Sequence, residues 1–225
     1  MPRHIVACGG QQLQHLALTS YVLSLVGRPR PKVLLIPTAS GDDPAYLLTF
    51  YQHLAGLSCE PSHLALFHRT IGDIDGLIRA QDVVIVGGGN TANMLAIWRL
   101  HGVDEALRKA YADGTVLTGA SAGCICWFEA GITDSFSPEL GPLRDGLGLL
   151  AGSACPHYDS EVRRRPVYQR EVATGFPAGV ALEDAVAARY DDERLFEIVS
   201  ARPDGRAFRV DAAGERPLEV RALGG

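Results

Sequence analysis

A serine flanked by small residues stands where it could act as a nucleophile. Residues 119–123 read Gly-Ala-Ser-Ala-Gly, after an apolar run typical of a buried strand and before a segment that favours a helix. This is the G-x-S-x-G pattern in the strand–turn–helix context of a nucleophile elbow. Glycines on both sides allow a sharp bend because they carry no β-carbon. The pattern predicts that the Ser121 hydroxyl projects from the turn at a helix N-terminus, whose dipole favours developing negative charge. An ordinary turn of small residues is the alternative.

A glycine run is the second feature that could do chemistry. Residues 87–91 read Gly-Gly-Gly-Asn-Thr and follow another apolar run. Open α/β sheets bind ligands at the carboxyl ends of their strands, where glycines let a ligand approach the backbone. A dinucleotide site is disfavoured because Ala92 occupies the last glycine position of the G-x-G-x-x-G pattern. The run instead favours an oxyanion donor that acts with the N–H of the residue after Ser121. A tight strand-to-helix turn is the structural alternative.

The third feature is a histidine downstream of the serine, in the sequence Cys-Pro-His-Tyr-Asp at 155–159. A nucleophilic serine needs a base, and neutral imidazole suits that role near pH 7. The preceding proline restricts the local backbone. These observations favour His157 as the base. The other six histidines all precede the serine and read as surface or structural residues: His4, His15, His53, His63, His68 and His101.

The elements that must position these residues alternate between short apolar runs and segments of helical period. This alternation predicts a three-layer α/β/α sandwich with a mostly parallel sheet, because strands covered on both faces are uniformly apolar. Strands are expected over residues 5–8, 32–37, 64–67, 82–86 and 115–118, and helices over 13–26, 44–55, 74–79, 91–101 and 104–112.

The pattern loosens after about residue 130. Residues 132–152 are rich in Gly, Pro, Ser and Asp, which predicts a long loop over the sheet. Weak strands with period-2 character follow at 180–187, 195–199 and 207–210, as in a more antiparallel edge. Nothing in the sequence resembles a linker or a repeat, so one domain is expected over residues 1–225.

Composition excludes several classes of protein. The chain has 225 residues, 47% of them hydrophobic and 21% charged, as in an ordinary globular protein. A formal net charge of −5 argues against a nucleic-acid partner, and no apolar run is long enough for a membrane helix. Five irregularly spaced cysteines favour buried thiols in a reducing, cytoplasmic compartment. Cys124 and Cys126 lack the second pair of a zinc site.

Taken together, the three motifs resemble the peptidase E (aspartyl dipeptidase) family of serine peptidases, which is related to cyanophycinase. Sequences of that family have Gly-Gly-Gly-Asn-Thr, then Gly-x-Ser-Ala-Gly, then Pro-His and an aromatic residue. The matching segments here are 87–91, 119–123 and 156–158, in the same order, and the resemblance covers nearly the whole chain. It implies a fold similar to class I glutamine amidotransferases, with a serine in place of their cysteine nucleophile.

The resemblance also implies the roles of individual residues. Ser121 matches the nucleophile and His157 the base, while the amides of Gly89 and Ala122 match the oxyanion hole. No metal or organic cofactor is implied.

The third member of the triad is less well matched. The family has a glutamate in a Leu-Pro-Glu-Gly-like segment, and the best match is Ala-Leu-Glu-Asp at 181–184, which makes Glu183 the expected partner of the histidine. Because this context departs from the family's, Asp184 and Asp159 stay open as alternatives. A plain surface carboxylate is the other interpretation of Glu183.

The implied activity is hydrolysis of dipeptides or short peptides from the N-terminal end, through an acyl-enzyme, with Asp-X as a candidate specificity. Arginine binds a carboxylate bidentately, so we expect Arg163 and Arg164 of the run at 163–165 to contact such a substrate, with Asn90 and Thr91 adding polar contacts. A solvated basic turn is the alternative.

Three other functions stay open at this point. A cyanophycinase-like hydrolase would cleave β-aspartyl links. A glutamine amidotransferase-like module would need a cysteine nucleophile, and Cys124 and Cys126 lie beyond the elbow. A non-catalytic small-molecule binding module would use the glycine run. The expected partner is a small peptide, and a homodimer is left open.

Overall fold

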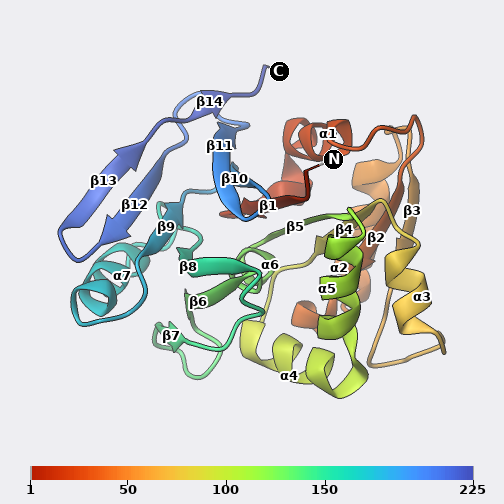
Figure 1. Ribbon diagram of the computed structural model, residues 1–225, viewed down its shortest axis with the longest axis horizontal. Coiled ribbons are helices and arrows are strands. Elements are labelled where there is room, and N and C mark those ends of the chain that lie inside the picture. The colour runs from red at the N-terminus through yellow and green to blue at the C-terminus, as the bar shows by residue number, and fades with distance from the viewer. Residues whose placement is uncertain (1, 225) are drawn as a thin grey trace.

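The computed structural model describes residues 2–224, and its larger sheet has eight strands. Five of them, in the order β1-β5-β4-β2-β3, are parallel, whereas β10 pairs antiparallel with both β1 and β11. β14 ends the sheet beyond β11 (Figure 1). The strands are β1 (His4–Cys8), β2 (Lys32–Ile36), β3 (Glu60–His63), β4 (Val83–Val86), β5 (Val116–Ala120), β10 (Val186–Asp191), β11 (Arg194–Ser200) and β14 (Arg221–Ala222).

Helices cover both faces of this sheet. Alternate residues of a strand face opposite sides, so Ile5 and Ala7 of β1 pack in one core while Val6 and Cys8 pack in another. The first core is closed by α3 (Ile74–Arg79), α4 (Thr91–His101), α5 (Val103–Ala112) and α6 (Ala122–Ile125). The second is closed by α1 (Leu16–Ser24) and α2 (Pro44–Leu54), and short 3-10 turns lie at Gln12–Gln14 and Thr38–Ser40.

A second sheet of six strands, in the order β13-β12-β9-β8-β6-β7, lies at the left of Figure 1. One side of it joins the first core through residues such as Ala154 and Leu182, and α7 (Arg164–Ala173) covers the other side through Tyr168 and Val172. The strands are β6 (Phe128–Thr133), β7 (Gly141–Leu143), β8 (Leu150–Cys155), β9 (Gly179–Leu182), β12 (Ala207–Asp211) and β13 (Gly214–Leu218).

The expected α/β sandwich with a mostly parallel central sheet is confirmed, but the expectations for its second half need correction. The segment 132–152, predicted as a loop, contains β7 and parts of β6 and β8. The predicted strand over 180–187 is two strands, β9 and β10, which belong to different sheets. Ala185 has a φ of 62°, which interrupts extended backbone and lets the chain turn from one sheet into the other. That the whole chain is one domain stays a prediction.

The strand expected at 64–67 was also wrong, because the strand lies just before it. β3 (Glu60–His63) is a polar edge strand that needs backbone partners only on the β2 side. Leu64 and Leu66 are buried where the chain leaves the sheet, and Asp42 Oδ2 accepts hydrogen bonds from the N–H groups of Leu66 and Phe67. The apolar pattern at 64–67 therefore reflects a loop whose leucines are buried and which is held by the side chain of Asp42, and not a strand.

The core beneath the glycine run predicts a large difference between two positions of α4. Trp98 is 0% exposed and its indole N–H donates to Thr38 Oγ1 at 3.1 Å, whereas Leu100 is 79% exposed. We expect Trp98→Ala to lower the free energy of unfolding by about 3–5 kcal/mol through lost burial and a cavity. Leu100→Ala on the same helix should change it by less than about 0.5 kcal/mol. Urea unfolding followed by fluorescence and circular dichroism measures both, and equal losses would contradict this packing.

Candidate active site

The turn after β5 holds Ser121 in a conformation that few residues adopt. Its backbone has φ 59° and ψ −113°, and such strained conformations cost of order 1–3 kcal/mol. Ser121 N–H donates to the carbonyl of Cys8 at 3.3 Å. The Ser121 carbonyl accepts the N–H groups of Cys124 and Ile125 at 2.9 and 3.0 Å. These bonds fix the turn on both sides, which is the geometry expected of a nucleophile elbow.

The two flanking glycines are required by close packing. A β-carbon on Gly119 would lie 2.7 Å from the carbonyl oxygens of Val86 and Gly123, and one on Gly123 would lie 2.3 Å from that of Val86. The elbow thus sits directly against the end of β4. Because α6 is only four residues long, the individual amides of the turn matter more than the expected helix dipole.

The glycine run after β4 adjoins the nucleophile. A β-carbon on Gly88 would lie 3.4 Å from Ser121 Cβ and 3.9 Å from Ser121 Oγ. Gly89 has φ +136°, and a β-carbon there would lie 2.1 Å from the carbonyl oxygen of Ala39. Only glycine fits at this position, so the run brings its backbone amides close to the serine.

Most amides of that run are already engaged. The N–H groups of Gly87, Gly88, Asn90 and Thr91 donate to Ile36 O (3.2 Å), Tyr46 Oη (3.2 Å), Ala39 O (2.8 Å) and Ser135 Oγ (2.9 Å), respectively. Within residues 2–224 the N–H of Gly89 has no such partner, and neither has the N–H of Ala122 on the other side of the serine. The two amides predicted to form an oxyanion hole are therefore free donors, as that role requires.

His157 is held by the same edge of the sheet. It follows β8 and Pro156, has φ 54°, and donates its backbone N–H to the Gly9 carbonyl at 3.1 Å. Ser121 is bonded to the carbonyl of Cys8, the preceding residue of the chain, so nucleophile and histidine are anchored at neighbouring positions. Within residues 2–224 no hydrogen bond joins His157 Nε2 to Ser121 Oγ; such bonds often tighten only when substrate binds.

The histidine is oriented by Asp184, which corrects the expectation for Glu183. Nδ1 of His157 lies 2.7 Å from Asp184 Oδ1, and Gln11 Nε2 donates to Asp184 Oδ2 at 3.1 Å. Burial acts to raise the pKa of Asp184, but the hydrogen bonds from His157 and Ser160, and to a smaller extent the positive charge of Arg202, outweigh it and hold that pKa below its ordinary value. The carboxylate is ionised at neutral pH, as a partner of the imidazole must be.

Glu183 points the other way. It is 2% exposed, and its oxygens accept the backbone N–H of Arg206 at 2.9 Å and Arg206 Nε at 2.8 Å. The third candidate, Asp159, accepts the backbone N–H of Asp184 at 2.8 Å. Neither carboxylate bonds to His157. Successive residues of a turn direct their side chains differently. The carboxylate that contacts His157 is therefore that of Asp184, one residue after the expected Glu183.

Three of the four residues expected to bind substrate have structural roles. Asn90 caps α4 through its side-chain oxygen and donates to the Ser135 carbonyl at 3.0 Å. Thr91 is buried at the start of that helix. Arg164 is 3% exposed and donates to Glu161 Oε2 at 2.7 Å and to Ile132 O at 2.8 Å. The prediction that Arg164 contacts substrate is wrong, because its guanidinium is buried and engaged.

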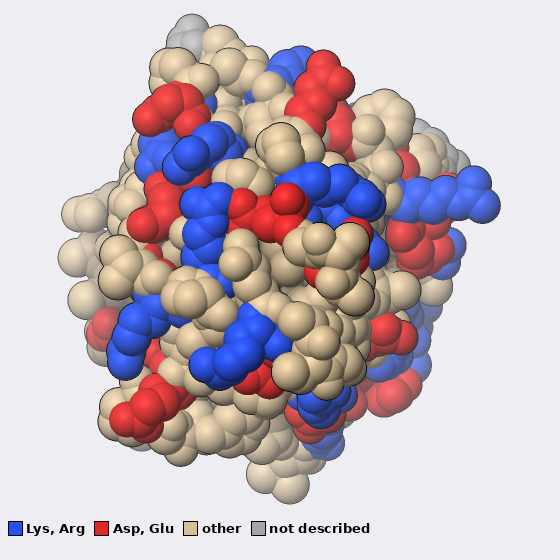
Figure 2. All heavy atoms as spheres, turned by 90° about the vertical axis from the view of Figure 1, so that its left-hand side faces the viewer, with Lys and Arg blue, Asp and Glu red and all other residues tan. Residues whose placement is uncertain are grey.

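Arg163 differs from its neighbours. It precedes α7, is exposed, and donates to the Pro138 carbonyl at 3.3 Å. Arg165 pairs with Glu215 and lies over the rings of Tyr158 and Phe208. Within residues 2–224 no carboxylate forms a salt bridge with Arg163, which leaves its charge available. Figure 2 shows a face of the molecule on which basic and acidic side chains are interleaved.

The cysteines near the site are buried and neutral. Burial raises the pKa of the Cys8 and Cys155 thiols to about 12, and it raises those of Cys124 and Cys126 well above their ordinary value. A thiol attacks as its thiolate, so these cysteines are poor nucleophiles at neutral pH. The described residues hold no group of three or more His, Cys, Asp or Glu that could bind a metal.

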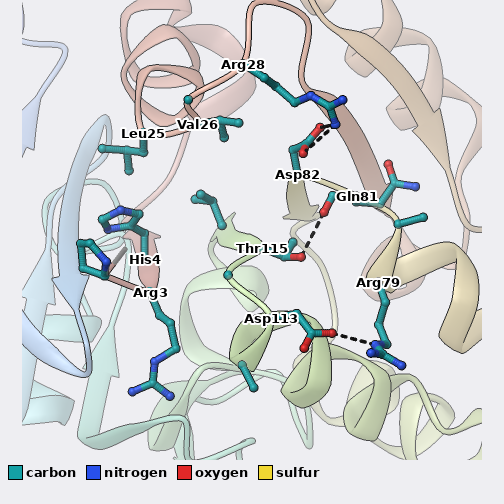
Figure 3. A pocket seen from close by; sticks show the side chains of 16 residues that line it. Arg3, His4, Leu25, Val26, Arg28, Arg79, Gln81, Asp82, Asp113 and Thr115 are labelled. Atoms are coloured by element: carbon teal, nitrogen blue, oxygen red, sulfur yellow. Dashed lines mark hydrogen bonds and ion pairs between the residues drawn. The ribbon is translucent and has the colours of Figure 1, made fainter.

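A separate hollow lies at the opposite edge of the sheet. It has a volume of about 770 Å³ and is lined by residues at the amino ends of β1, β4 and β5, such as His4, Asp82 and Thr115 (Figure 3). Four residues of β5 lie between its lining residue Val116 and Ser121, and the five steps of about 3.3 Å along the strand give about 17 Å. Arg28 and Arg79 at its rim pair with Asp82 and Asp113. It is separate from the site at the carboxyl ends.

The carboxyl edge of this α/β sandwich carries the parts of a serine-type hydrolase. They are a serine in a strained turn, two backbone amides without partners among residues 2–224, and a histidine that contacts a buried carboxylate. The sequence model of peptidase family S51 matches residues 5–198. The chain is 42% identical over 231 residues to the uncharacterized peptidase YgaJ of Bacillus subtilis (strain 168), covering 99% of this chain and 100% of that protein. It is 33% identical over 132 residues to peptidase E of Shewanella denitrificans, over 57% of this chain and 54% of that protein. The chain belongs to peptidase family S51, and it is a serine-type peptidase.

Solved structures share the fold. A peptidase from an acI-B1 Actinobacterium matches with a TM-score of 0.73 at 17% identity, over 98% of this chain and 95% of that one. A Listeria monocytogenes EGD-e protein provisionally named peptidase E matches with a TM-score of 0.67 at 18% identity, over 87% and 98%. Among residues 2–224, no helix has the length and apolar character needed to cross a membrane.

The different surroundings of the two neighbouring carboxylates predict different effects of removing their charges. Asp184→Asn should lower kcat by about 10⁴-fold, because an amide no longer selects the imidazole tautomer that can accept a proton. Glu183→Gln should keep kcat within about tenfold but lower the free energy of unfolding by about 1–2 kcal/mol, since it weakens the bonds to Arg206 and Arg202. Peptide hydrolysis and urea unfolding of both variants test this, and the reverse pattern would restore Glu183 as the partner of His157.

Proposed function

We propose that this peptidase hydrolyses dipeptides or short peptides from the N-terminal end, through a Ser121–His157–Asp184 triad. The observation that carries the proposal is the arrangement at the end of β1, where successive carbonyls accept the N–H groups of Ser121 and His157 while Asp184 holds the imidazole. The family assignment supports a peptide as the substrate.

The chemistry follows from these positions. Ser121 Oγ attacks the scissile carbonyl carbon and passes its proton to His157 Nε2, while Asp184 stabilises the imidazolium through Nδ1–H. The developing oxyanion accepts the N–H groups of Gly89 and Ala122. When the C–N bond breaks, His157 returns the proton to the leaving amine and an acyl-enzyme remains. Water then attacks this ester, with the same histidine as base, and regenerates the serine hydroxyl.

Removal of the nucleophile tests the mechanism. Ser121→Ala should lower hydrolysis of a responsive dipeptide by up to about 10⁶-fold, and His157→Ala should be similarly damaging because the two act as a unit. Labelling by a serine-reactive phosphonate should disappear with Ser121→Ala and persist with Ser137→Ala, which changes an exposed serine between β6 and β7. Circular dichroism checks that each variant is folded. A Ser121→Ala protein that stays labelled and active would refute the triad.

A preference for an N-terminal aspartate is the finer part of the proposal, and Arg163 is its candidate determinant. Arg163 reaches Pro138 in the β6–β7 loop, and Ser135 of that loop accepts the N–H of Thr91 in the glycine run. The exposed guanidinium of Arg163 and the glycine run that adjoins Ser121 therefore contact the same loop. A charge-assisted hydrogen bond from it to a substrate carboxylate is consistent with this arrangement.

Specificity kinetics test the role of Arg163. Arg163→Met should lower kcat/KM for Asp-X peptides by about 10–100-fold, as expected for loss of a hydrogen bond between charged groups, and leave Ala-X peptides nearly unchanged. Arg170→Met is the matched control, because Arg170 is also exposed but pairs with Glu171 within α7. An equal loss for both substrates would remove the support for an aspartate preference.

A further inference from the structure

One guanidinium lies behind the carboxylate that orients His157. Arg202, in the turn after β11, has Nη1 3.0 Å from Asp159 Oδ2. The other oxygen of Asp159 accepts the backbone N–H of Asp184 at 2.8 Å. Arg202 is therefore connected to Asp184 through a single intervening side chain.

The same guanidinium also faces a second carboxylate, since Arg202 Nη2 lies 3.4 Å from Glu183 Oε2. Its turn is fixed by Ser200, whose hydroxyl accepts the Arg202 N–H at 2.9 Å and donates to the Arg202 carbonyl at 2.7 Å. A third carboxylate, the exposed Asp204, lies 3.6 Å from Arg202 Nε. A cation in a fixed position thus pairs with Asp159, Glu183 and Asp204, and Asp159 connects it to Asp184. Arg206, the other arginine on Glu183, has a side chain that is 62% exposed, so water screens its charge more strongly.

We propose that Arg202 is a positioning residue, which fixes Asp184 through Asp159 and thereby acts on the electrostatic surroundings of His157. The inference rests on the proposed triad, although its central measurement needs no turnover.

The sign of the electrostatic effect follows from the groups around His157. Asp184 bonds to the imidazole, Asp159 and Glu161 belong to the turn of His157 itself, and the neutral thiol of Cys8 comes from β1. Arg202 comes from the turn after β11, and Glu183 and Asp204 are its other partners. Anions stabilise the imidazolium and cations destabilise it. Loss of the Arg202 charge leaves Asp159 unopposed, so the pKa of His157 should rise and a higher pH should be needed to free the base.

Loss of the Asp159 charge should act in the opposite direction. In Asp159→Asn the side-chain oxygen can still accept the Asp184 N–H, but Arg202 keeps its positive charge with one carboxylate fewer beside it. The pKa of His157 should fall. Opposite shifts from two substitutions in one contact are expected of electrostatic coupling, whereas loosened packing gives no reason for opposite signs.

The experiment measures the pKa of His157 by NMR titration of its imidazole C–H signals, assigned by their absence in His157→Ala. We expect Arg202→Met to raise this pKa by roughly 0.5–1 unit and Asp159→Asn to lower it. Arg202→Lys should restore most of the wild-type value, and Arg206→Met is the matched control that should leave it in place. The acid limb of the pH profile for phosphonate labelling of Ser121 should move with the NMR value.

Two results would overturn the proposal: an unchanged His157 pKa in Arg202→Met, or an equal shift in Arg206→Met. If Arg202→Met does not fold, Asp159→Asn decides, and an unchanged or raised pKa in that variant refutes the coupling. Failure of the proposed function is recognised separately, because it would leave these NMR shifts intact while wild-type protein showed no phosphonate labelling dependent on Ser121.

Discussion

Three successive carbonyls at the carboxyl end of β1 hold the site together. Those of Cys8, Gly9 and Gly10 accept the N–H groups of Ser121, His157 and Ala185, at 3.3, 3.1 and 3.0 Å. These partners come from the turns after β5, β8 and β9, and so from both sheets. A displacement of β1 would therefore move the nucleophile, the histidine and the segment of the orienting carboxylate together.

This arrangement requires the small residues that follow β1. A β-carbon on Gly9 would lie 2.2 Å from the Glu183 carbonyl oxygen, and one on Gly10 would lie 1.9 Å from Asp184 Oδ1 and 2.7 Å from the His157 ring. The strained turn of Ser121 also requires residues without a β-carbon, because Gly119 and Gly123 pack against the end of β4. Close backbone contacts on both sides hold a conformation that the serine would not otherwise keep.

Charge is distributed around the site in a way that keeps each group in its working state. The buried thiols stay neutral because burial raises their pKa values. Asp184 stays ionised because hydrogen bonds from His157 and Ser160, with a smaller contribution from the charge of Arg202, outweigh its desolvation. Of the three consecutive arginines before and within α7, two are paired with glutamates. Among residues 2–224 the first of them, Arg163, forms no such pair, so most of the basic run is engaged within the protein.

The sequence by itself determined the class of fold and the residues at the turns. Ser121, His157 and the glycine run are read from motifs of about five residues, whose strand and helix context is also local. The tertiary structure decided which carboxylate meets the imidazole. Glu183 and Asp184 are chain neighbours, and the turn between β9 and β10 sends one to Arg206 and the other to His157. It also decided that segment 132–152 contributes to a second sheet and that Arg164 is buried. Side-chain partners and strand pairings of this kind join residues far apart in the chain, so no local pattern records them.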